Sequence, residues 1–273
     1  MHIILPPAFT EQHKAAAFKF VQDPRQLTRT EWLSTLACFD LLHSAIVEHR
    51  DGKETFAHIY QRLIEARFAD AYISALYRVA NVTQAAEPLR AQVSRQIRGL
   101  LRRAELYDPT QAETFYLFAY CLYWWYAFAK GFAFEVEVLR DLAQTGIEFQ
   151  THDLRHRRGR LSPFDLVVLG FTGDIKTSTY FLHVARSQTL ANDFYITRLT
   201  DEHGRYRTLV VFLKPPAWEA INGETIPAIL RTLSTVLPAV AEIEHRGRTL
   251  VVLEYEEWKT RVLKVQRKEQ SDE

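Results

Sequence analysis

The stretch Ser162-Pro-Phe-Asp-Leu-Val-Val-Leu-Gly-Phe-Thr-Gly-Asp-Ile-Lys176 decides the fold of the second half of this 273-residue chain. Asp165 opens an apolar run that predicts a strand, a short turn follows, and a second strand carries Asp174 and Lys176. Because side chains alternate across a strand, these two lie on one face and Ile175 points to the other. A hairpin would bring Asp165 close to Asp174. The sequence therefore predicts two carboxylates and an ammonium group at one place.

That set of side chains suits the metal-assisted hydrolysis of phosphodiesters. Carboxylates hold a hard divalent cation, and a lysine can orient or deprotonate the attacking water. A surface hairpin with a solvated salt bridge is the alternative from this stretch alone. Against it, an aspartate beside the apolar run 166–169 is unfavourable in a strand unless a site needs it there.

A third acid is expected on a helix upstream. Residues 131–146 have the pattern of an amphipathic helix that ends at a glycine. At about 100° per residue, Glu135 falls in the middle of the apolar face, among residues such as Phe134 and Val138. Glu137 falls on the opposite side. A buried carboxylate is costly unless it is paired or binds a metal, so Glu135 either belongs to the same site or reaches water at the edge of the apolar stripe.

These motifs together resemble the PD-(D/E)xK nuclease superfamily. The shared order is a helix with a glutamate, a strand, a strand that opens with an aspartate, a strand with Asp-x-Lys, and another helix. Pro163-Phe164-Asp165 stands for the first motif, with one inserted residue, and Asp174-Ile175-Lys176 stands for the second. Residues 131–137 look like the start of the first core helix in archaeal Holliday-junction resolvases. The resemblance covers roughly residues 131–214.

The resemblance implies an α/β fold with a restriction-endonuclease-like mixed-sheet core, and it implies a role for each site residue. Asp165, Asp174 and the carbonyl of Ile175 would ligate Mg²⁺ or Mn²⁺. Glu135 would ligate the ion directly or through water, and Lys176 would assist the nucleophile. Asp replaces the Glu that many members carry before x-Lys. This shorter ligand leaves the number of metal ions open.

The composition is that of an ordinary globular protein, with 47% hydrophobic and 25% charged residues. A formal net charge of +1 neither requires nor excludes a nucleic-acid partner, so any such surface is expected to be local. The two cysteines, Cys38 and Cys121, are too few for a disulfide scaffold. With no secretory signal pattern, this favours a reducing, cytoplasmic location. Residues 115–129 are uncharged and aromatic, but shorter than the roughly 20 residues that span a bilayer. A buried core helix is therefore expected, rather than a segment that docks to a membrane or partner.

Two regions are expected. Residues 1–130 predict an all-helical region for nucleic-acid or partner binding, with helices over 28–47, 54–82 and 88–106. Residues 131–273 predict the nuclease-like domain. Its expected strands are 147–153, 164–169, 174–177, 193–199, 207–214 and 249–253, and its further helices are 179–190, 226–237 and a charged terminal helix.

Two sets of arginines are candidates for contact with phosphates. The first set, Arg95, Arg98 and Arg102, recurs along one face of the third helix, opposite the apolar residues Val93, Ile97 and Leu101. The second set, Arg155, Arg157, Arg158 and Arg160, forms a basic loop just before Asp165. A solvated helix face and a solubilising loop are the alternatives.

The residues and the resemblance together predict a divalent-metal-dependent endonuclease with no membrane partner. DNA is the expected substrate, and RNA stays open as the alternative. Cutting of both strands by one site per chain would need a homodimer or a partner protein. The alternative is a non-catalytic nucleic-acid-binding or assembly protein built on a nuclease fold.

Overall fold

The computed structural model describes residues 1–24, 27–49, 52–80, 82, 89–177, 190–200, 206–213, 215–221 and 251–272. The chain forms two compact units, Met1–Lys130 and Gly131–Glu273. Their boundary lies within the helix α7 (Ala112–Thr145), at the residue where the sequence divides the two regions. The helices expected over 179–190 and 226–237 lie outside the described residues, apart from residue 190.

The first unit is mostly helical, but the prediction of an all-helical region is wrong. Its elements are β1 (His2–Ile4), α1 (Glu11–Gln22), α2 (Arg29–Leu42), β2 (Ile46–His49), β3 (Gly52–Thr55), α3 (Phe56–Ile59), η2 (Tyr60–Glu65), α4 (Ala66–Arg78) and α6 (Leu89–Arg103). The three strands form an antiparallel sheet in the order β1-β2-β3. The helix expected to reach residue 47 therefore stops at Leu42, because Ile46 and Val47 pair with the distant residues of β1. Pairing between segments so far apart leaves no periodic signal in either one.

The start of α2 is encoded locally, as the sequence predicts. Thr28 caps the helix in a reciprocal capping box with Glu31. The backbone N–H of Glu31 donates to the Thr28 hydroxyl at 3.3 Å, and the Glu31 carboxylate accepts from the Thr28 N–H at 2.8 Å. The burial of Phe39 and Leu42 then fixes the inner face of the helix.

The aromatic segment and the glutamate-bearing helix are one continuous helix, α7, rather than two. Gly131 does not break it, because a single glycine in a helix costs only about 1 kcal/mol relative to alanine. The aromatic part is buried, as expected for a core helix, and Phe118 and Tyr120 are covered completely or almost so. No helix in the described part of the chain is both long enough and apolar enough to cross a membrane.

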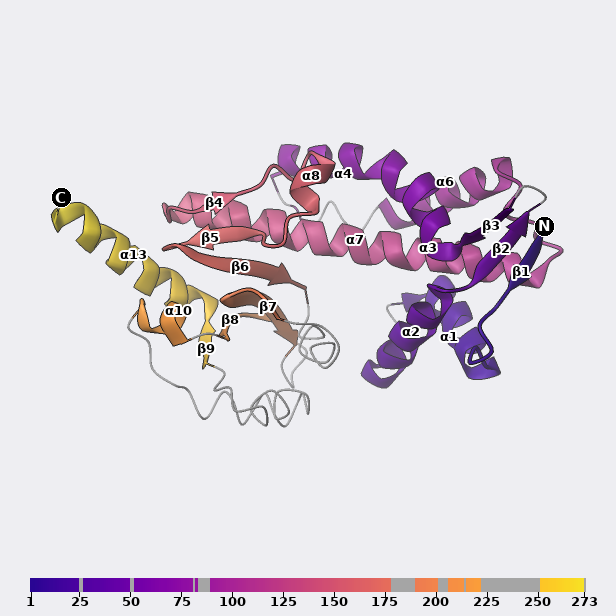
Figure 1. Ribbon diagram of the computed structural model, residues 1–273, viewed down its shortest axis with the longest axis horizontal. Helices are drawn as coiled ribbons and strands as arrows, with labels where there is room; N and C mark the ends of the chain where they lie inside the picture. Colours follow the sequence, from indigo (N-terminus) through magenta and orange to yellow (C-terminus); the bar gives the residue numbers. More distant parts are fainter. Residues whose placement is uncertain are drawn as a thin grey trace. The chain divides into compact units, whose positions relative to one another are not determined.

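The second unit is built on a mixed sheet, as the sequence predicts. Its elements after α7 are β4 (Gln150–Thr151), α8 (Arg157–Arg160), β5 (Leu166–Val168), β6 (Phe171–Lys176), β7 (Phe194–Thr200), β8 (Tyr206–Phe212), α10 (Pro215–Glu219), β9 (Val251–Glu254) and α13 (Tyr255–Asp272). The described strands follow the order β4-β5-β6-β7-β8-β9, and α13 leads from β9 to the C-terminus (Figure 1). The β6–β7 pair is parallel, and the other pairs are antiparallel.

The β5–β6 hairpin sets the position of the acidic residues. Its turn is made by Leu169 and Gly170, both with positive φ (50° and 79°), as in the two-residue turns whose twist matches that of paired strands. This turn fixes Val168 opposite Phe171 and Leu166 opposite Gly173. Continuing the register by one residue places Asp165 opposite Asp174.

A glycine is required beside the acidic residues. A Cβ atom on Gly173 would lie 2.3 Å from Cζ of the buried Phe194 and 3.0 Å from Leu166. We expect Gly173→Ala to destabilise the fold by about 1–3 kcal/mol, the usual cost of overpacking a core. Urea unfolding would measure this loss. The matched control is Gly131→Ala, where a Cβ meets nothing within 4 Å and the helix should gain about 0.5–1 kcal/mol. Equal effects of the two substitutions would contradict the packing argument.

Candidate functional site

The hairpin brings the first two predicted acids together. The Asp165 N–H donates to the Gly173 carbonyl at 2.9 Å, which extends the ladder one residue beyond β5. Its carboxylate then accepts the Ile175 N–H at 2.6 Å and shares a hydrogen bond with the carboxyl group of Asp174. From β4, the Thr151 hydroxyl donates to the Asp165 carbonyl at 2.8 Å. Asp165 is thus held by both of its neighbouring strands.

Lys176 lies on the same face of β6 as Asp174, and the two form an ion pair. The Nζ atom of Lys176 donates to Oδ1 of Asp174 at 2.6 Å, with 14% of the Asp174 side chain and 42% of the Lys176 side chain exposed. Burial lowers the pKa of Lys176, but the charge and hydrogen bond of Asp174 outweigh burial, so the pKa is raised overall. The lysine therefore keeps its proton here, which suits orienting a water molecule better than deprotonating it.

Glu135 faces the interior, and the alternative in which it reaches water is wrong. Only 6% of the residue is exposed, and its Oε1 atom has no hydrogen-bond partner among the described residues. Burial, and after it the charge of Asp165, raises the pKa of Glu135 to about 9. Glu137 lies on the other side of the helix, as predicted, but it is only half exposed because Arg198 of β7 forms an ion pair with it.

Bound protons reduce the charge repulsion within this group of acids. Burial raises the pKa of Asp165 to about 8, and the hydrogen bond and charge of Asp174 add to the shift. The Ile175 N–H and the charge of Lys176 oppose it without cancelling it. With both Glu135 and Asp165 shifted upward, the site binds protons that ordinary surface carboxyl groups would release at neutral pH.

The donor atoms at the site fit a hard divalent cation. Carboxylate and carbonyl oxygens are the ligands that Mg²⁺ prefers, and Oε1 of Glu135, which has no hydrogen-bond partner in the described part of the chain, could serve as one once the proton is released. As the side chains lie, no group of three or more His, Cys, Asp or Glu in the described part of the chain is arranged to hold a metal ion. One oxygen of Asp165 is engaged by Ile175 and one of Asp174 by Lys176. Ligation by all three acids would therefore require side-chain rotation.

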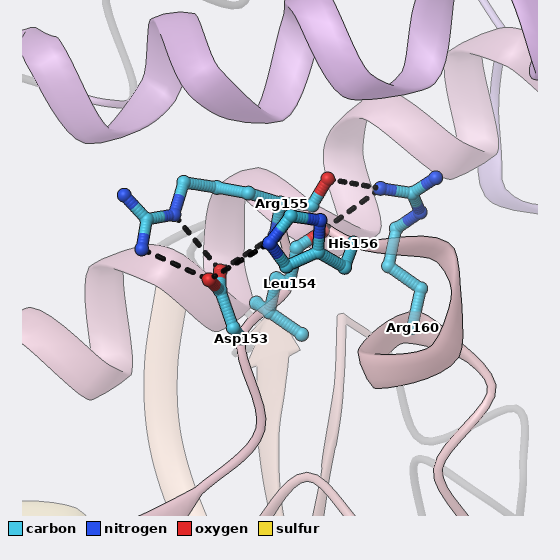
Figure 2. A network of polar contacts seen from close by, with 5 residues as sticks. All are labelled: Asp153, Leu154, Arg155, His156 and Arg160. Atoms are coloured by element: carbon cyan, nitrogen blue, oxygen red, sulfur yellow. Dashed lines mark hydrogen bonds and ion pairs between the residues drawn. The ribbon is translucent and has the colours of Figure 1, made fainter.

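The basic loop before Asp165 is more ordered than predicted. Its end forms the short helix α8, and two of its four arginines hold the loop itself (Figure 2). Arg155 makes a two-point ion pair with Asp153, with both contacts at 2.9 Å. Arg160 donates to the backbone carbonyl of Leu154 at 2.9 Å. Arg155, Arg157 and Arg158 are all exposed, but Arg155 is engaged by Asp153, so Arg157 and Arg158 are the better candidates for contact with phosphates.

The other arginine stripe is also partly used within the fold. Val93, Ile97 and Leu101 are buried, as predicted. Arg98, however, does not face outward: its guanidinium lies 4.6 Å from the centre of the Phe118 ring, in a cation–π contact. Arg102 lies 5.6 Å from the Tyr107 ring and is otherwise exposed, and Arg95 is exposed. The spacing of the arginines alone could not reveal this, because the ring that attracts Arg98 comes from another helix.

Sequence reasoning missed the contribution of β7. Its parallel register places Tyr195 opposite Asp174 and Thr197 opposite Lys176, so both point to the face that carries the site. Tyr195 is buried, which raises the pKa of its phenol, and it hydrogen-bonds with Asn192. Asn192 is itself buried and donates to the Pro163 carbonyl at 3.2 Å. No pattern within one strand predicts its register against another, so no sequence signal marked these residues.

Comparison of the chain with protein-family models, with curated proteins and with solved structures gave no match. The likeness to the PD-(D/E)xK nucleases accordingly remains a proposal.

The buried glutamate predicts how the stability of the cation-free protein depends on pH. Because the pKa of Glu135 is raised from 4.5 to about 9 on folding, the folded protein keeps a proton that the unfolded chain releases between these values. The contribution of Glu135 to the free energy of unfolding is therefore largest below pH 4.5, and it is lost as the pH rises towards 9. We expect urea unfolding in a chelator to show that fall in the wild type and a smaller one in Glu135→Gln. The exposed Glu269→Gln should keep the wild-type slope. Equal slopes in wild type and Glu135→Gln would contradict the assignment.

Proposed function

We propose that this protein is a divalent-metal-dependent phosphodiesterase, an endonuclease that acts on DNA in preference to RNA. The observation that carries the proposal is the buried carboxyl group of Glu135, whose Oε1 atom has no described partner, in the electrostatic range of Asp165 and Asp174. A carboxyl group in that position is unfavourable unless a cation or proton neutralises it. Lys176 supplies the ammonium group that this chemistry uses.

The order of elements in the second unit supports the proposal. A helix bearing Glu135 precedes β4, β5 follows Asp165, and β6 carries Asp174 and Lys176. These three strands are antiparallel neighbours, and β7 then adds in parallel. This is the succession that the family resemblance implies, up to the helix expected over 179–190, which lies outside the described residues apart from residue 190.

Each residue has a distinct role in the proposed reaction. Asp165, Asp174 and Glu135, with the Ile175 carbonyl, would hold the cation, which would supply positive charge for the phosphate and make a nearby water more acidic. Lys176, which keeps its proton, would hold the attacking water by donating a hydrogen bond and stabilise the negative charge that develops on the phosphate oxygens.

The basic residues suggest how a polynucleotide would be held. Arg157 and Arg158 are exposed on α8, a few residues before Asp165 in the chain, and both are available to phosphates flanking the scissile bond. Arg155 and Arg160 are assigned instead to holding the loop that presents them. In the first unit, Arg95 and Arg102 are exposed and Arg98 is engaged with Phe118, which makes that stripe a weaker candidate.

A second candidate function is a non-catalytic nucleic-acid-binding or assembly protein. One observation favours it: Asp174 is held by Lys176 and Asp165 by the backbone, so the described acids do not form a ready metal site. Cation binding distinguishes the two candidate functions, because a non-catalytic nucleic-acid-binding protein does not need a divalent cation at this site.

Cation binding is the first prediction of the proposal. A ligand of the folded state stabilises it by about 2.7 kcal/mol at a hundred times its dissociation constant. We expect Mn²⁺ to raise the unfolding temperature of the wild type in a concentration-dependent way, and we expect this response to be lost in Asp174→Asn. Replacement of the exposed Asp70 by Asn is the matched control and should keep the response. A wild type that does not respond to Mn²⁺ or Mg²⁺ would shift the assignment to the binding protein.

Cleavage is the second prediction. With Mg²⁺ or Mn²⁺, we expect the wild type to cut labelled DNA, tested as duplex, single-stranded and branched substrates alongside RNA. Loss of the Lys176 ammonium group in Lys176→Ala should lower the rate at least about a hundredfold, the usual cost of removing one group that stabilises transition-state charge. Lys264→Ala, an exposed lysine on α13, should cut like the wild type. Undiminished cutting by a folded Lys176→Ala protein would refute the site assignment.

A further inference from the structure

Thr197 on β7 is a buried polar residue with no evident structural role. The residue has no exposed surface, and its hydroxyl oxygen has no hydrogen-bond partner among the residues that the structure describes. Valine has nearly the same shape and would avoid leaving a hydroxyl unpaired. Among the described residues, this buried hydroxyl is therefore open to a hydrogen-bond partner.

The register of the sheet places Lys176 next to this hydroxyl. Thr197 is directly opposite Lys176 in the parallel β6–β7 pair, and directly opposite residues place their side chains on the same face. The lysine has a flexible four-carbon stem and 42% of its side chain is exposed, so its ammonium group is able to turn towards a neighbouring strand. A threonine hydroxyl has two acceptor lone pairs for such a group.

The ion pair of Lys176 explains why the hydroxyl is unpaired here. The ammonium group of Lys176 donates to Oδ1 of Asp174 at 2.6 Å. If Asp174 turns to ligate a cation, as the proposed function requires, this contact is weakened because the carboxylate oxygens are committed elsewhere and because two cations repel each other. Lys176 then needs another acceptor close to its present position.

We propose that Thr197 is a positioning residue that takes over Lys176 from Asp174 when a divalent cation binds. The inference rests on the proposed function and adds a coupling between cation binding and the orientation of the lysine. In the cation-free state, Lys176 neutralises Asp174. In the bound state, the Thr197 hydroxyl accepts a hydrogen bond from the Lys176 ammonium group and holds it beside the site rather than on a ligand.

The surroundings of Thr197 are suited to a fixed acceptor. Asn192 and Asp193, just before β7, tie this strand to the hairpin. Asn192 donates to the Pro163 carbonyl, and the Asp193 carboxylate accepts from both the N–H and the hydroxyl of Thr172 at 2.8 Å. Next to Thr197 on the same face, Tyr195 is buried beside Asp174. The position of the hydroxyl relative to Lys176 is therefore set by contacts outside the acidic group.

The test compares Thr197→Val with Thr197→Ser. Valine removes the acceptor and serine keeps it, while Thr208→Val, half-buried on β8 opposite Arg198, is the control on the other face of the sheet. We expect Thr197→Val to be at least as stable as the wild type without cations, since an unpaired hydroxyl is removed. Its affinity for Mn²⁺, followed by thermal shift, should fall about tenfold, as expected for loss of one hydrogen bond to a charged group. The rate constant kcat should fall with KM for the nucleic acid unchanged, and serine should restore both.

The possible outcomes are distinct. Suppose that the wild type binds Mn²⁺ and cuts, and that Thr197→Val has the same Mn²⁺ affinity and kcat. This result would refute the role of Thr197 and leave the proposed function standing. A wild type that neither binds cations nor cuts would refute both. If valine prevents folding, Thr197→Ala against Thr197→Ser makes the same comparison, and equal Mn²⁺ affinities there would also refute the role.

Discussion

The physical constraint at the centre of the second unit is that three carboxyl groups and one ammonium group lie together in a partly buried place. Glu135, Asp165 and Asp174 repel one another when charged, and Lys176 compensates one of the three charges. Burial removes the solvent that would screen the rest. The upward pKa shifts of Glu135 and Asp165 are the physical result of this arrangement. This arrangement is maintained because the β5–β6 hairpin and the helix α7 fix the backbone that carries these side chains.

Much of this site could be predicted from the sequence because its determinants are local. A short hairpin turn and alternation along a strand were enough to place Asp165 near Asp174 and both on the face of Lys176, although the second strand begins at Phe171 rather than at the expected residue 174. The helical period alone put Glu135 inside and Glu137 outside. The aromatic segment was correctly expected to be buried, but residues 115–129 and 131–146 were expected as two helices, and their fusion into α7 was missed. Composition gives no measure of whether one glycine ends a helix.

Contacts between segments that are far apart in the sequence could not be predicted. The sheet of β1, β2 and β3 depends on pairing of residues 2–4 with residues 46–48. Arg98 is attracted by Phe118, which belongs to another helix. In each case an exposed, charged or β-branched residue was interpreted from its own neighbours alone. The same limit applies to Thr197, whose meaning depends on a register that only the folded sheet defines.

The turn at Leu169 and Gly170 has a consequence for how this chain can vary. Side chains alternate with a period of two, so an insertion or deletion of one residue in the turn that was absorbed by shifting β6 would place Asp174 and Lys176 on the opposite face from Asp165. Two inserted residues would move them along the strand but return them to the same face. Whether the site can form thus depends partly on whether the number of residues in the turn changes by an odd or an even number. At this turn, the number of residues matters more than their identity, and a change in length by one is equivalent to losing two site residues at once.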